Sequence, residues 1–243
     1  MRCHHEMPFG ARLQDGGGAL FRLWAPAARQ VELALETGSA PQLHPAQADA
    51  QGWWTCRIPQ ARAGTLYRWR IDGDLLVPDP ASRYNPEGPH GPSCLVDPQQ
   101  FEWDAGWNGR PWHETVLYEL HVGTFTPEGT FAAAIARLDY LVDLGVTAVE
   151  LMPVADFPGR RGWGYDGVLL FAPDAAYGTP EDLKRFVDEA HRRGLMVLLD
   201  VVYNHFGPEG NYLHAYCPHF FNEAKHTPWG AAINFDGGAS AVA

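Results

Sequence analysis

The hydrophobic pattern of this 243-residue chain changes its period near residue 110, and this change constrains the fold more than any other feature. Before it, apolar and polar residues alternate over short segments, a pattern that predicts strands and turns. After it, short and mainly apolar runs alternate with helical patterns, which predicts strand–helix–strand units. The sequence therefore predicts two domains of different class, an all-β domain over residues 1–105 and an α/β domain over residues 106–243.

The first part predicts a small antiparallel β-sandwich of the immunoglobulin-like type. The predicted strands lie at residues 31–36, 53–58, 66–71 and 75–77. In the third of these, Tyr67, Trp69 and Ile71 would point inward. Asp72-Gly73 then gives the typical signal of a hairpin turn. Short strands at this spacing favour a sandwich.

The second part predicts three parallel strands joined by two helices. The predicted strands lie at residues 116–122, 146–152 and 195–202. Thr130 would cap the first helix and Gly145 would end it. The second helix would start at Thr179-Pro180-Glu181-Asp182 and end at Gly194. A long loop, at about residues 154–178, would lie between the second strand and the second helix.

The βαβαβ pattern fits either a doubly wound sheet or the opening of a (β/α)₈ barrel. Residues 195–199 form a continuous apolar run, as expected of a parallel strand that is buried on both faces. The turn at residues 123–127 has neither the GxGxxG pattern nor the P-loop pattern of a nucleotide-binding sheet. The barrel is therefore favoured, and barrels carry their chemistry at the carboxyl ends of the strands.

Polar residues follow each of the three predicted strands. Asp200 would either form a structural ion pair or orient an active-site group, because an unpaired buried carboxylate is costly. His205 would either have a structural role or contact a ligand. Tyr165 and Asp166 lie on a Gly-flanked loop. That loop would either pack on its own aromatic residues or stack on a sugar ring and accept bonds from its hydroxyl groups.

Composition and motifs argue against several function classes. No run approaches the roughly 20 apolar residues of a membrane span. The start of the chain lacks the apolar segment of a signal peptide. A net charge of −11 with only two lysines argues against nucleic acid or anionic lipid as a partner. No HExxH or GxSxG motif is present, so we predict no metal, no cofactor and no hydrolase nucleophile elbow. The four cysteines lack CxxC spacing, which favours reduced thiols and a cytoplasmic location.

The run at residues 200–205, Asp-Val-Val-Tyr-Asn-His, resembles the first signature of the α-amylase superfamily of glycoside hydrolases and transferases. Further resembling segments lie at residues 21–26, 117–131, 163–168 and 232–237. The resemblance extends from about residue 10 to the end of the chain. The run at 121–131 is closest to the trehalose-releasing hydrolases, although branching and debranching enzymes share the same layout of sandwich and barrel.

The resemblance implies hydrolysis of the α-1,4 bond beside the terminal trehalose of maltooligosyl-trehalose, an α-1,4-glucan substrate, with release of trehalose. It also implies roles for five residues of this chain. Tyr165 would stack under the sugar at the reacting subsite, Asp166 would bind its hydroxyl groups, and His205 would bind the same sugar. Asn204 would join them in the substrate site. Asn204 and Asp200 would also hold the end of the third strand in place. Asp200 would do so by contacting an arginine of a later strand.

The resemblance also implies that the catalytic carboxylates lie outside this chain. In the superfamily they follow strands four, five and seven, whereas only three strands fit here, and the fourth-strand pattern Gly-x-Arg-x-Asp is not found. We therefore expect an inactive N-terminal fragment and assign no catalytic residue. Two alternatives stay open: the N-terminal part of a 1,4-α-glucan branching enzyme, and a non-catalytic glucan-binding module that works through its sandwich. No oligomeric state is predicted.

Overall fold

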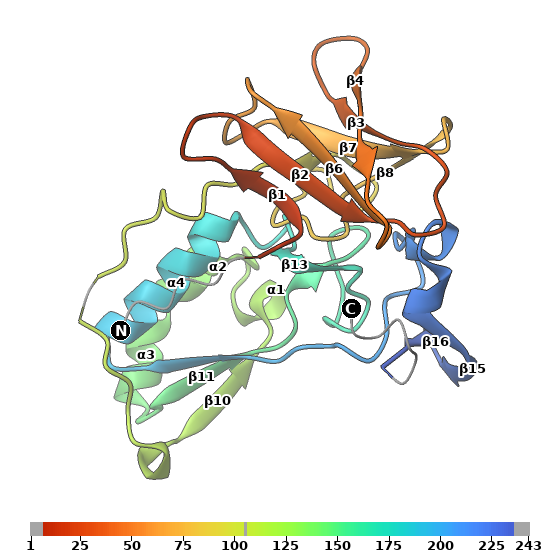
Figure 1. The fold of residues 1–243 in the computed structure, drawn as a ribbon. Helices are drawn as coiled ribbons and strands as arrows, with labels where there is room; N and C mark the ends of the chain where they lie inside the picture. The colour runs from red at the N-terminus through yellow and green to blue at the C-terminus, as the bar shows by residue number, and fades with distance from the viewer. Residues whose placement is uncertain (1–6, 105, 236–243) are drawn as a thin grey trace.

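The chain has an all-β part followed by an α/β part, in the order that the sequence predicts. The computed structural model describes residues 7–104 and 106–235. Figure 1 shows the sheets of the first part above a separate sheet that helices cover on one side. Among the described residues no helix is long and apolar enough to cross a membrane.

The first part is a sandwich of two antiparallel sheets, as predicted. One sheet has the order β1 (Gly10–Leu13), β2 (Ala19–Trp24), β6 (Trp53–Ile58) and β5 (Gln47–Ala48). The other has the order β4 (Gln42–Pro45), β3 (Val31–Leu35), β7 (Leu66–Ile71) and β8 (Leu75–Val77), with β9 (Ser93–Cys94) also pairing with β7.

Strand β7 shows why this part folds as the pattern predicts. Tyr67, Trp69 and Ile71 are all at most 3% exposed and point into the sandwich. Asp72 and Gly73 have φ angles of 50° and 92°, the left-handed conformation of a tight hairpin turn, and β8 then pairs antiparallel with β7. The period-two pattern therefore sets which side chains of β7 are buried, and the turn residues set its pairing with β8.

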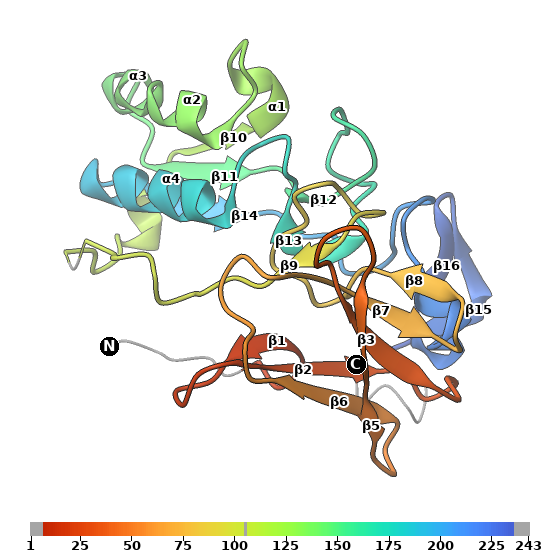
Figure 2. The same cartoon turned by 90° about the horizontal axis from the view of Figure 1, so that it is seen from above.

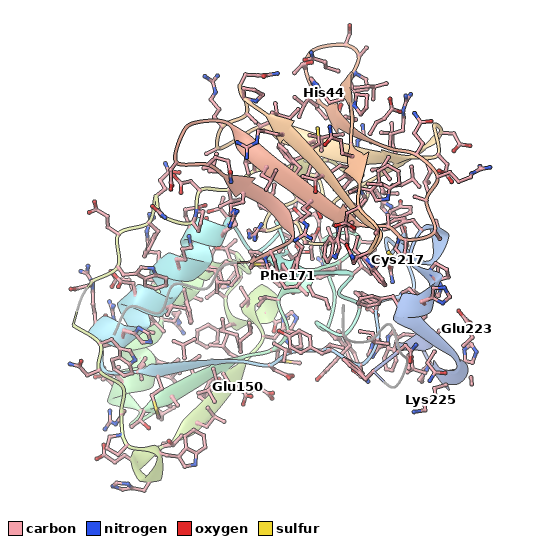
Figure 3. All side chains as sticks on the ribbon, in the orientation of Figure 1. His44, Glu150, Phe171, Cys217, Glu223 and Lys225 are labelled. Atoms are coloured by element: carbon pink, nitrogen blue, oxygen red, sulfur yellow. The ribbon has the colours of Figure 1, made fainter. Side chains whose placement is uncertain are left out.

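The hydrophobic core of the sandwich also includes residues from the end of the described chain. Six buried residues beyond position 205 belong to it: Phe206, Leu213, Tyr216, Cys217, Phe221 and Ile233. Figure 3 shows Cys217 directly beneath the sandwich. The Cys217 thiol donates a hydrogen bond to the carbonyl oxygen of Trp24 at 2.8 Å. The end of the described chain therefore completes the core of the sandwich, while the parallel sheet and its helices have a hydrophobic core of their own.

The second part contains the three predicted parallel strands. They are β10 (Leu117–Leu120), β11 (Ala148–Leu151) and β14 (Met196–Leu199), which pair in this order. The helices α2 (Phe131–Ile135), α3 (Leu138–Asp143) and α4 (Pro180–Arg192) cover one face of this sheet (Figure 1). Phe131, Leu138 and Phe186 are fully buried beneath them. This arrangement is that of the first three βα units of a barrel.

The prediction that the third strand is buried on both faces is wrong. Every residue of β14 is at least partly exposed, and the Leu199 side chain is 48% exposed. Within the described residues no strand pairs with the outer edge of β14, and the helices cover only one face of the sheet. Glu150 lies on the other, open face (Figure 3), and Leu117 on the same face is 44% exposed.

Two further expectations need correction. The first helix is divided into α2 and α3, because the chain tightens into a turn in which the Arg137 amide bonds to the Ala134 carbonyl at 3.0 Å. The expected loop at 154–178 contains a short antiparallel pair, β12 (Ala155–Asp156) and β13 (Leu169–Pro173). Seen from above, this pair lies between the sandwich and the helices (Figure 2).

The remaining elements are short or lie near the end of the described chain. Helix α4 begins as predicted: the Thr179 side chain accepts from the Asp182 amide, and the Asp182 side chain accepts from the Thr179 amide. The other elements are the 3₁₀ turns η1 (Trp112–Glu114), η2 (Leu213–Ala215) and η3 (Pro218–Phe220), the short helix α1 (Val122–Phe125), and the hairpin of β15 (Phe221–Thr227) and β16 (Gly230–Ile233).

Candidate substrate-binding site

Two segments far apart in the sequence bring the predicted site residues together. One follows β12 and carries Tyr165 and Asp166, and the other follows β14 and carries Asn204 and His205. The segments touch through their backbones, because the Gly207 amide donates to the Gly167 carbonyl at 3.0 Å.

His205 is the central residue of this contact. Its side chain is buried, and its Nε2 lies 3.1 Å from the Tyr165 carbonyl oxygen. Its Nδ1 lies 3.2 Å from Oδ1 of Asn204. The structure therefore brings His205 to Tyr165, while both ring nitrogens already have protein partners. The direct contact of His205 with a sugar stays a prediction.

Trp229 belongs to the same cluster and was missed at the level of sequence. It lies in the turn between β15 and β16, its ring stacks on that of His205 at 4.6 Å, and its Nε1 donates to Oδ1 of Asp166 at 3.0 Å. The only sequence signal is the turn Thr-Pro-Trp-Gly at residues 227–230, which does not show where the hairpin packs.

Asp200 ends the third strand as predicted, but no arginine accompanies it in the described residues. Its amide donates to the Leu151 carbonyl at 2.9 Å, which ties the end of β14 to β11. Its carboxylate has no hydrogen bond or ion pair with any residue in the described ranges. The proposed link from Asp200 to a later strand therefore stays a prediction.

A cleft of about 580 Å³ lies where β10 and β11 end, and it is lined in part by the loop that leads to Tyr165. Residues that line it include His121, Thr124, Met152, Arg160, Arg161, Trp163 and Tyr177. Nε2 of His121 lies 2.8 Å from the Gly162 carbonyl oxygen, which fixes the loop over the cleft. The Trp163 side chain is 79% exposed, so this loop does not pack on that aromatic residue.

Asp156 and Asp174 form a buried carboxyl pair behind the same loop. Asp174 accepts from the amides of Phe157 at 3.1 Å and Ala176 at 2.7 Å, whereas both oxygens of Asp156 are buried without a donor. Burial, and next the neighbouring charge of Asp174, raise the pKa of Asp156 to about 8. This raised pKa favours the protonated form of Asp156 at neutral pH, and burial also raises the pKa of Asp174.

Two family models match this chain. The first, "Alpha amylase, catalytic domain", matches residues 88–227. The second, "Carbohydrate-binding module 48 (Isoamylase N-terminal domain)", matches residues 8–82. These ranges cover the α/β part and the sandwich.

Several curated relatives match nearly the whole chain. The malto-oligosyltrehalose trehalohydrolase of Saccharolobus solfataricus is 48% identical over 96% of this chain and 41% of its own length. That of Deinococcus radiodurans is 46% identical over 92% of this chain and 36% of its own length. A 1,4-alpha-glucan branching enzyme of Bacillus caldolyticus is 33% identical, over 39% of its own length. The chain thus spans about two fifths of the relatives that it matches.

Solved structures of α-amylase-type enzymes also resemble this chain. A crystal structure of a putative alpha amylase from Salmonella typhimurium has a TM-score of 0.92 and 49% identity, and the match covers 98% of this chain and 40% of that one. A pullulanase of Anoxybacillus, at 24% identity and a TM-score of 0.81, shares the fold. Since the catalytic-domain model matches more than half of its residues, the chain belongs to the α-amylase family.

Proposed function

We propose that this chain supplies the sandwich and the first three βα units of a glycoside hydrolase that releases trehalose from maltooligosyl-trehalose. The observation that carries the proposal is the cluster of Tyr165, Asp166, Asn204, His205 and Trp229, formed by segments that resemble the trehalohydrolases. We also propose a cytoplasmic location for the protein, which the free thiols at the described cysteines Cys56, Cys94 and Cys217 support.

The chemistry of the cluster suits an uncharged sugar. The side chains of Tyr165 and Trp229 are 36% and 38% exposed, so each presents part of an aromatic ring on which the apolar face of a hexose can stack. The Asp166 carboxylate, one oxygen of which already binds Trp229, has further acceptor capacity for hydroxyl groups. We propose that the reacting end of the glucan lies on this cluster and extends toward the neighbouring cleft.

We propose that the chain binds this substrate without cleaving it. Retaining cleavage needs two carboxyl groups about 5–5.5 Å apart, both reaching the substrate. Asp156 is only 1% exposed, so it cannot reach a sugar. Asp166 is bonded to Trp229, and Glu209 lies beside His90. We therefore propose no catalytic pair among these carboxyl groups.

The test is binding of maltooligosyl-trehalose to the 243-residue chain, measured by calorimetry. Tyr165→Ala should weaken binding by about tenfold or more, equivalent to ~1.4 kcal/mol. Tyr140→Ala is the matched control, since Tyr140 is 55% exposed on α3 and away from the cluster. Equal affinities for wild type and Tyr165→Ala would exclude the cluster as the site.

The same samples separate the other candidate functions. We expect no trehalose by chromatography after incubation of the chain with the substrate, and turnover would show that we misplaced the catalytic carboxylates. A branching enzyme, which the 33% identical relative keeps as the second candidate, should not prefer maltooligosyl-trehalose to a plain maltooligosaccharide of equal length. A glucan-binding sandwich would keep its full affinity when Tyr165 is replaced.

A further inference from the structure

A histidine of the N-terminal part touches the segment that carries the candidate site. His90 lies in the segment between β8 and β9. Its Nδ1 lies 2.6 Å from the Tyr212 hydroxyl, and its Nε2 lies 3.1 Å from Oε1 of Glu209. One half-exposed ring therefore bridges two side chains of a loop more than a hundred residues away.

The bridge has a consistent arrangement of protons. A neutral imidazole has one N–H donor and one acceptor nitrogen. Nε2–H can donate to the Glu209 carboxylate while the Tyr212 hydroxyl donates to Nδ1. A single tautomer satisfies both contacts, so His90, Glu209 and Tyr212 form one hydrogen-bonded unit.

The loop that this unit holds is the one that carries Asn204 and His205. Phe206 and Leu213, on either side of Glu209 and Tyr212, are buried in the core of the sandwich. Gly210, at φ +93°, brings the loop backbone so close to Pro89 that an added Cβ would lie 3.0 Å from the Pro89 Cβ. The residue next to His90 and the residue next to Glu209 are thus in direct contact.

We propose that His90 is a positioning residue for the substrate site. Through Glu209 and Tyr212 it holds residues 204–213 on the N-terminal part, and this keeps His205 against the Tyr165 carbonyl. The effect on substrate rests on the proposed function, whereas the ordering of the loop does not. The N-terminal part then serves the site by holding one of its loops, without having to bind glucan itself.

The first test is hydrogen exchange of the 243-residue chain, followed by mass spectrometry. His90→Ala removes both bonds and should speed the exchange of amides at 204–213 by about 2-fold or more, since about 2-fold is the lower end of the range expected for a single net hydrogen bond. Amides of β3 and β7 should not change. His113→Ala, at an exposed histidine of η1, is the matched control and should leave the loop unaffected.

A conservative variant separates positioning from general destabilisation. His90→Gln keeps one donor and one acceptor and should restore part of the protection that His90→Ala loses. Tyr212→Phe keeps the ring and removes the hydroxyl, so adding it to His90→Ala should have little further effect. The proposal is overturned if His90→Ala leaves the loop unchanged, if exchange rises equally over the whole chain, or if Gln behaves like Ala.

The second test is binding of maltooligosyl-trehalose to the same variants. His90→Ala should weaken it by a factor similar to the change in exchange, and Gln should restore part of the loss. If wild type binds no glucan, the proposed function fails, and the exchange result alone decides whether His90 positions the loop. If wild type binds and His90→Ala binds equally well despite faster exchange, the positioning role is overturned.

Discussion

Gly207 occupies the point where the two site-bearing segments touch. A Cβ built on it would lie closer than 3.0 Å to the Asp166 carbonyl oxygen, a backbone atom that cannot turn aside. Gly207→Ala should therefore push the segments apart and lower the free energy of unfolding by about 1–3 kcal/mol, as overpacking does. The measurement is urea denaturation. Gly16→Ala is the control, because nothing lies within 4 Å of a Cβ there and its φ is not in the left-handed range. Equal losses for both variants would contradict the contact.

The Asp156–Asp174 pair predicts an unusual pH dependence. The pKa of Asp156 is raised from 3.8 to about 8 in the folded chain, so its contribution to stability is complete below pH 4 and is lost as the pH rises to about 8. Asp156→Asn is neutral at every pH. Its stability relative to wild type should therefore rise between pH 4 and 8 and level off above, measured by denaturant titration at each pH. A difference that does not change with pH would refute the raised pKa of Asp156.

Substitution of Asp174, the other member of the pair, should have a different effect on stability. Asp174 accepts from two backbone amides with two different oxygens, and asparagine has only one acceptor oxygen. Asp174→Asn should leave one buried amide unpaired and lose about 1–3 kcal/mol of stability at low pH, where both carboxyl groups of the wild type are protonated. The two substitutions remove the same charge, so opposite results at pH 8 would assign the proton to Asp156.

At this scale the sequence predicts some residues of the cluster and misses others. Tyr165, Asp166, Asn204 and His205 follow predicted strands, and parallel strands end at the same edge of a sheet, so their meeting could be expected. Trp229 could not be predicted, because its place depends on how the hairpin of β15 and β16 folds back onto the loops. The carboxyl pair was missed since Asp174 lies in a segment predicted to be irregular.

Among the elements, α4 has the best-defined start. Thr179 and Asp182 exchange hydrogen bonds between side chain and backbone, which satisfies two amides of the first turn. Thr179→Ala should lower the free energy of unfolding by about 0.5–2 kcal/mol, measured by chemical denaturation. Thr179→Ser keeps the hydroxyl group and should lose much less. If serine were as destabilising as alanine, the loss would come from the packing of the methyl group instead of the cap.

The elements also show what periodicity can and cannot fix. The strands β3, β6 and β7 and the helix α4 lie where the pattern places them, because alternation or a cap marks each one. The division of the first helix could not be predicted, since Phe131, Leu138 and Leu141 keep helical spacing across the turn at Arg137 and are all buried. Burial of β14 depends on neighbours, which a strand's own residues do not specify.

For the molecule as a whole, we expect the open face and edge of the parallel sheet to favour association with other chains. Strand β10 is an edge strand of the described sheet, and Leu117 on it is 44% exposed. Exposed apolar edges pair with other chains, and lysine on an edge opposes this. Leu117→Lys should increase the monomer fraction in sedimentation velocity. Tyr140→Lys, at a side chain 55% exposed on α3, adds the same charge away from the sheet and should not. Equal effects would point to net charge as the cause.

The order of an all-β part and an α/β part follows from the change in hydrophobic period, and the sequence predicts it well. The joining of the two parts does not follow from it, because Phe206, Tyr216 and Cys217 read as loop residues. Only the structure shows that they complete the core of the sandwich. Contacts between segments that are distant in sequence leave no periodic signal in either segment.

Because the core of the sandwich includes residues from the end of the described chain, it cannot be completed early in synthesis. The sandwich strands are made by about residue 94, but their core is complete only when Ile233 has been added. At 5–20 residues per second, translation takes roughly 7–30 s to cover this interval. During it the nascent sandwich exposes the surface that Phe206, Tyr216 and Cys217 will cover. Transiently exposed apolar surface promotes aggregation, so we expect the nascent chain to be most prone to aggregate in this interval.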